Sequence, residues 1–134
     1  MKELTWLLAL SLAAVLVALV VAPQLVALTL WLGASWAPTA TLRIAAHASF
    51  ELPLWGTGVG LFAIARRLGW LYSVRAAVLV TLAAPLAEGM LAVAIGRIPP
   101  GFSTPTGMAV RAVVAALALA GAVLLARRRG LGNA

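Results

Sequence analysis

The chain has 134 residues, of which 64% are hydrophobic and only 10% are charged. An ordinary soluble domain carries about 25% charged residues, so this composition argues against one and predicts an integral membrane protein. The net charge of +7 comes from basic residues at the ends of apolar runs, without the interleaved aromatic residues of a nucleic-acid interface. The chain has no cysteine, which excludes disulfides and thiolate metal sites.

The first apolar stretch, Leu4–Trp36, is longer than the roughly 20 residues that cross a bilayer. Pro23 divides it into a first crossing, Leu4–Val21, and a second piece, Leu25–Trp36. That piece either continues the helix at a tilt or turns back as a half-helix packed in protein. A cleaved signal peptide is the alternative for the N-terminus, but the apolar run exceeds the roughly 7–15 residues of a signal sequence, and Glu3 interrupts its basic start.

Three more crossings are expected, separated by a turn and by loops rich in glycine, arginine or proline. Prolines lie inside two of them and remove backbone hydrogen bonds. The sequence therefore predicts one transmembrane domain over residues 1–134, an all-α bundle of about four crossings with kinked or broken helices at Pro23, Pro53 and Pro85. The expected segments are a turn at Ala34–Thr39, crossings at Arg43–Ala65 and Trp70–Ile95, a loop at Arg97–Pro105 and a last crossing at Thr106–Ala126.

The basic residues predict the orientation of these crossings. Most lie on one side of a four-crossing arrangement, and such groups stay in the cytoplasm. We therefore expect a multi-pass protein of the plasma membrane, surrounded by lipid, with both termini cytoplasmic. Aromatic residues fall at the two membrane interfaces, and only Trp55 falls near mid-membrane. The residues on the cytoplasmic side are Lys2, Arg66, Arg67, Arg75 and Arg127–Arg129, and those nearer the other side are Arg43, Arg97 and Arg111.

Two ionisable residues of the second crossing, His47 and Glu51, lie four positions apart and share one face of a helix. In hydrocarbon such a residue costs roughly 2.5–3.5 kcal/mol, so it persists mainly where it is paired, hydrated or used. Counting inward at about 1.5 Å per residue puts Glu51 and Glu88 at a common depth of roughly 12–13 Å, with Arg111 within reach. The sequence thus predicts a functional polar cluster of these four residues in the outer half of the bundle.

Three roles for this cluster remain open. It either holds the helices in register by hydrogen bonds, or relays a proton or cation beside the proline kinks, or binds a metal. The candidate metal ligands are His47, Glu51 and Glu88, since two carboxylates and one imidazole occur in catalytic zinc sites. Metal-dependent hydrolysis is the least favoured role, because the chain has one histidine and no His-Glu-x-x-His pattern.

The stretch after Pro53 contains three glycines at alternate positions. Gly56 and Gly60 form the small-xxx-small pattern that lets helices approach closely, and the alternative is a glycine-rich turn. A bundle of this size has little room for a transport pathway of its own. Transport would therefore require a homo-oligomer, for which Gly56 and Gly60 offer a contact.

The segment His47-Ala48-Ser49-Phe50-Glu51-Leu52-Pro53 resembles the His-Gly-x-Phe-Glu-Leu-Pro signature of the stage II sporulation protein M family of bacterial and archaeal membrane proteins. A second stretch, Ala83–Glu88, is similar to the alanine-rich approach to a glutamate in that family's later helix. The resemblance covers roughly Leu25–Gly96, with Ala48 in place of a glycine and Gly89-Met90 in place of an aromatic residue. It carries over the positions His47, Phe50, Glu51, Pro53 and Glu88.

This resemblance implies a polytopic membrane protein without established enzymatic chemistry, whose sporulation members act with partner proteins in peptidoglycan remodelling during engulfment. We therefore expect a non-enzymatic scaffold or assembly partner in envelope remodelling, with no cofactor. Its expected partner is a membrane protein or a second copy of the chain. The alternative is a small oligomeric transporter, or an ion- or proton-conducting protein, that uses the polar cluster and binds a cation.

Overall fold

The computed structural model describes residues 2–97 and 104–127, and these ranges contain helices and turns without strands. Each of the four helices is long and apolar enough to cross a membrane, which confirms the predicted all-α bundle of about four crossings. Most of the predicted Arg97–Pro105 loop, together with Arg128 and Arg129, lies outside the described residues. The helices are α1, Lys2–Gly33; α2, Thr39–Arg67; α3, Val74–Ala94; and α5, Pro105–Arg127.

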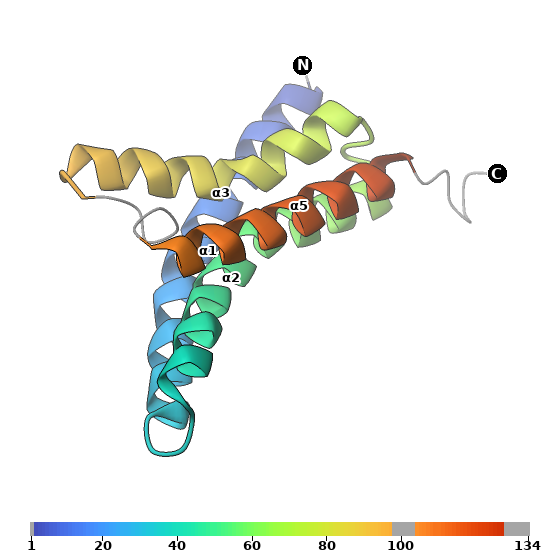
Figure 1. Cartoon of the computed structure of the whole chain (residues 1–134). Helices are drawn as coiled ribbons and strands as arrows, with labels where there is room; N and C mark the ends of the chain where they lie inside the picture. The colour runs from blue at the N-terminus through green and yellow to red at the C-terminus, as the bar shows by residue number, and fades with distance from the viewer. Residues whose placement is uncertain (1, 98–103, 128–134) are drawn as a thin grey trace.

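None of the three prolines breaks its helix, since Pro23, Pro53 and Pro85 lie inside the continuous helices α1, α2 and α3. A proline removes one N–H donor, but in hydrocarbon the remaining backbone groups find partners only in each other, so the helix continues on both sides. Leu25–Gly33 is therefore the second part of α1 and not a re-entrant half-helix. α2 changes direction near its middle, where Pro53 lies, and we attribute this bend to the proline (Figure 1).

α3 begins at Val74, later than the predicted Trp70, because two local interactions hold a loop there. Gly69 has a φ of 80°, a conformation that favours glycine, and the Trp70 N–H donates to the Ala65 carbonyl at 2.8 Å to close the end of α2. The Ser73 Oγ then accepts the Ala76 N–H at 3.0 Å and caps α3. The predicted helix start was therefore wrong.

On α1 most of the side chains that face the interior of the bundle are small, and large ones face outward. On α1 the buried positions recur every four residues and are mostly alanine, whereas leucine and valine occupy the exposed positions between them. Lipid tails are as apolar as leucine, so close packing of small residues, and not apolar burial, holds membrane helices together. This distribution supports a membrane environment. The buried residues are Leu10, Ala14, Ala18 and Ala22, and the exposed ones include Leu8, Leu12, Leu16 and Val20.

The bundle is closed at one end and open at the other. The backbones of α2 and α3 each approach those of all the other helices, whereas no Cα atom in the described part of α1 lies within 8 Å of one in α5. The four helices meet where α1 and α3 begin and where α2 and α5 end, and a buried cluster that includes Leu10, Phe62, Val80 and Ala122 fills this closed end (Figure 1). Toward the other end, the α1–α2 hairpin and the second half of α3 point in different directions (Figure 1).

Aromatic and polar contacts join the start of α1 to the α2–α3 loop at the closed end. The rings of Trp6 and Trp70 stack with centroids 3.9 Å apart and planes 3° from parallel. The Ser73 Oγ donates to the Glu3 carboxylate at 3.2 Å. An aromatic pair of this kind contributes about 0.5–1.5 kcal/mol beyond its buried area, so these contacts stabilise the closed end.

Candidate functional site

Three buried charged side chains from three helices meet in the bundle. Arg111 of α5 donates from Nε to Glu51 Oε1 of α2 at 2.7 Å and from Nη2 to Glu51 Oε2 at 3.0 Å. Its Nη2 also donates to Glu88 Oε2 of α3 at 3.2 Å. Glu51, Glu88 and Arg111, here called the triad, are 1%, 6% and 8% exposed. One guanidinium therefore joins α2, α3 and α5 in a water-poor environment.

The two carboxylates of the triad differ in how well their oxygens are paired. Glu51 accepts two bonds from Arg111, and its Oε1 also accepts the indole N–H of Trp55 at 3.1 Å. Paired donors on both oxygens are what a carboxylate needs in an apolar interior. Glu88 Oε1, by contrast, is buried and has no donor among the described residues. The triad thus contains one carboxylate, Glu51, with a donor on each oxygen. In the other, Glu88, only Oε2 has a donor among the described residues.

Helix periodicity explains why each carboxylate points inward. Glu51 lies on the buried stripe of α2. Leu54 follows it by three residues, and Gly58 follows Leu54 by four. Glu88 lies on the corresponding stripe of α3, which includes Thr81 and Ala84. Arg111 is near the start of α5, and its long side chain reaches from there into the interior.

Gly58, and not Gly56 or Gly60, provides the close helix contact inside this chain. A Cβ at Gly58 would lie 2.5 Å from the Val80 carbonyl oxygen and 2.6 Å from the Thr81 Cα, so α2 and α3 touch backbone to backbone there. A Cβ at Gly56 or at Gly60 would meet nothing within 4 Å. All three glycines are helical, which excludes the alternative of a glycine-rich turn.

His47 is not bonded to the triad. It lines a cavity of about 280 Å³ with Leu30 of α1 and Arg43 of α2, and among the described residues no hydrogen bond or ion pair joins it to either carboxylate. A polar contact between α1 and α2 is the 2.6 Å hydrogen bond between the hydroxyls of Thr29 and Ser49. The recorded contacts therefore connect three of the four predicted residues, Glu51, Glu88 and Arg111.

Of the candidate metal ligands His47, Glu51 and Glu88, the two carboxylates are joined through Arg111, and His47 has no recorded contact with either. In the part of the chain that the structure describes, no group of three or more His, Asp or Glu side chains is placed to hold a metal ion. Two of the three candidates share a guanidinium as their partner. The chemistry that this arrangement supplies is charge pairing between helices.

The chain was also compared with known proteins. No family model, curated protein or solved structure matches it significantly. The resemblance to the stage II sporulation protein M family therefore rests on the sequence motifs alone. Among its motif positions, Glu51 and Glu88 belong to the triad, Phe50 packs against the buried cluster of Leu54 and Trp55, and Pro53 lies at the bend of α2.

Trp55 and Gly58 are the site residues that sequence reasoning missed. Both could have been found from Glu51, because Trp55 follows it by one helical turn and Gly58 by two, on the same face. A tryptophan near mid-membrane also needs a partner for its N–H, and a carboxylate one turn away is the nearest acceptor. This spacing does not, however, predict which helix faces pack against one another.

Proposed function

We propose that this chain is a non-enzymatic, multi-pass protein of the plasma membrane that acts as a scaffold or assembly partner in envelope remodelling. The observation that carries this proposal is the triad, in which one guanidinium pairs with carboxylates from two other helices. Such a contact fixes the relative positions of α2, α3 and α5. A membrane scaffold needs a fixed shape of this kind, and the resemblance to the stage II sporulation protein M family points to the same role.

The proposed partner is another membrane protein or a second copy of the chain. Gly56 and Gly60 are open to a neighbouring helix, because neither is used for packing inside the chain. Small residues at this spacing let two membrane helices approach closely. The open positions of Gly56 and Gly60 support the proposal that a partner helix packs against this part of α2.

A small oligomeric transporter or proton-conducting protein is the second candidate, and Glu88 favours it. Its Oε1 is buried without a donor from the described residues, and the triad combines two carboxylates with a single guanidinium. An unpaired acceptor in an apolar interior is a binding position for a proton or a cation. Transport by this chain would then depend on the carboxyl groups of Glu51 and Glu88.

Substitutions of Glu51 separate the two candidates. Glu51→Gln keeps the size and the acceptor for Trp55 but removes the charge, whereas Glu51→Leu removes both. For a scaffold we expect Gln to be largely tolerated, Leu to be destabilising, and wild-type vesicles to pass no more protons or monovalent cations than protein-free vesicles. The measurements are unfolding in mixed micelles and flux into proteoliposomes.

The same experiment also identifies a transporter. Wild-type flux that disappears in Glu51→Gln or Glu88→Gln, while both variants unfold like the wild type, would replace the scaffold proposal with the transporter. Crosslinking in lipid adds a control, since a chain that is only monomeric contradicts the oligomeric transporter.

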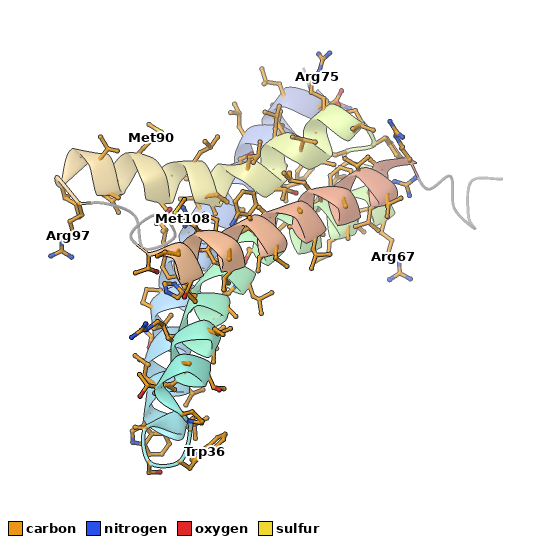
Figure 2. All side chains as sticks on the ribbon, viewed as in Figure 1. Trp36, Arg67, Arg75, Met90, Arg97 and Met108 are labelled. Atoms are coloured by element: carbon orange, nitrogen blue, oxygen red, sulfur yellow. The ribbon has the colours of Figure 1, made fainter. Side chains whose placement is uncertain are left out.

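We further propose that both termini are cytoplasmic. Arg67 and Arg75 lie at the closed end of the bundle, whereas Arg97 lies at the far end of α3 (Figure 2). Lys2 and Arg127, at the start of α1 and the end of α5, belong to the closed end as well. Because clustered Lys and Arg stay on the cytoplasmic side, the closed end is expected to face the cytoplasm.

Reporter fusions test this orientation. We expect a fusion at Gly132 to report the cytoplasm and a fusion inserted after Arg97 to report the opposite side. A fusion at Lys2 is the matched control and should agree with the one at Gly132. If the fusions at Gly132 and after Arg97 report the same side, α5 does not cross the membrane and the four-crossing arrangement is wrong.

A further inference from the structure

An apolar groove runs along α3 beside the crossing of α2 and α5. It has a volume of about 850 Å³, and its wall is the outward face of α3 from Leu82 to Ala94, which includes Gly89 and Val93. Arg111 of the triad also lines it, as does Trp55, which donates a hydrogen bond to Glu51 of the triad. We call this cavity the α3 groove. Its size and its apolar lining with a single charged group are those of a ligand site.

The length of the α3 groove matches one leaflet of a bilayer. Leu82 and Ala94 are twelve residues apart, or roughly 18 Å at 1.5 Å per residue, and one leaflet supplies about half of a hydrocarbon core of roughly 30 Å. Closer to the cytoplasmic end, Ala76, Ala77 and Val80 of α3 are buried in the closed part of the bundle. A transmembrane helix would have to extend past that point, whereas an acyl chain of one leaflet would not.

A positive charge lies at the outer end of the groove. Arg97 follows α3 by three residues, is exposed, and is found at the far end of that helix (Figure 2). An arginine guanidinium forms strong, charge-assisted hydrogen bonds with a phosphate group. We propose that the α3 groove holds an acyl chain of an anionic phospholipid whose phosphate lies against Arg97.

The position of Trp55 makes this site accessible to measurement. Trp55 is buried, with 7% of its surface exposed, and it lines the groove. An acyl chain in the groove would therefore contact the indole, and it would also cover the side of Arg111 that faces the groove. The proposal does not depend on whether the chain is a scaffold or a transporter.

The test uses the full chain in vesicles that contain phospholipid brominated on its acyl chains, which quenches tryptophan fluorescence on contact. The Trp55 signal is the difference between the chain and its Trp55→Phe variant. We expect brominated phosphatidylglycerol to quench this signal at about a five-fold lower mole fraction than brominated phosphatidylcholine, the ratio that corresponds to about 1 kcal/mol for one basic residue. Arg97→Gln should remove this preference while quenching remains.

Two glycine substitutions provide the matched pair. A Cβ at Gly89 in the groove, or at Gly121 of α5 outside it, meets nothing within 4 Å, so either position accepts a side chain. We expect Gly89→Phe to abolish quenching of Trp55 and Gly121→Phe to leave it unchanged. If Trp55→Phe does not fold, crosslinking of a diazirine-bearing phospholipid to the peptide that contains Met90, mapped by mass spectrometry, gives the same comparison.

Two results would overturn the proposal. The first is a Trp55 signal that neither brominated lipid quenches, which would mean that protein, such as a second copy, fills the groove. The second is equal quenching or equal crosslinking in Gly89→Phe and Gly121→Phe, which would mean that the lipid contact lies elsewhere. Quenching without a preference for the anionic lipid would overturn the part assigned to Arg97.

Discussion

Arg111→Met is expected to lower the free energy of unfolding by about 3–5 kcal/mol, the cost of leaving buried charges without their partner. Methionine keeps most of the apolar length of the side chain but none of the five guanidinium donors. Glu51 would lose two of its three recorded hydrogen bonds, and Glu88 would lose its only recorded one. Denaturant-induced unfolding in mixed micelles, followed by circular dichroism, measures this change.

The matched control repeats Arg111→Met in the background Glu51→Gln and Glu88→Gln. In that background Arg111 is a buried charge without a carboxylate partner, so replacing it with methionine should cost little or even stabilise the bundle. The difference between the two backgrounds is the coupling energy of the triad, and we expect about 2 kcal/mol or more. An equal cost in both backgrounds would show that Arg111 stabilises the bundle through the packing of its stem and not through charge.

Gly58→Ala is expected to destabilise the bundle by about 3 kcal/mol, at the upper end of the usual range for overpacking. The added methyl would lie 2.5 Å from the Val80 carbonyl oxygen and 2.6 Å from the Thr81 Cα. Because these are backbone atoms of α3, no side chain can rotate away, and the two helices have to separate. Separation of α2 from α3 would also move Glu51 away from Glu88 and so strain the bonds that Arg111 makes to both.

The neighbouring glycines supply the comparison for this variant. In Gly56→Ala and Gly60→Ala the new methyl meets nothing within 4 Å, so we expect these variants to gain about 0.5–1 kcal/mol from the higher helix propensity of alanine. The opposite signs are the result to look for in the same unfolding assay. A Gly58→Ala variant as stable as Gly60→Ala would mean that α2 and α3 are not in backbone contact at this level.

The sequence by itself determined the all-α class and, for the last three apolar helices, the ends to within four residues, whereas α1 continues to Gly33, well past the predicted end of the first crossing at Val21. Apolar runs of this length can be read without knowledge of their neighbours, because the bilayer imposes the same length on every crossing. Helix periodicity and depth also indicated that Glu51 and Glu88 lie at one level, since a carboxylate exposed to hydrocarbon is costly. The start of α3 was missed because the Ser73 cap and the positive φ of Gly69 act locally against an otherwise apolar run.

Tertiary structure alone decided which helix faces meet. The sequence does not distinguish between three glycines of α2, yet Gly58 packs against α3, and Gly56 and Gly60 have open space beside them. Similarly, His47 shares a helix face with Glu51 but lines a cavity to which Glu51 does not contribute. The physical reason is that lipid solvates apolar side chains as well as a protein interior does. A buried face and a lipid-facing one therefore have similar sequences, and only the pairing of helices shows that Arg111 reaches both carboxylates and that α3 leaves a groove beside them.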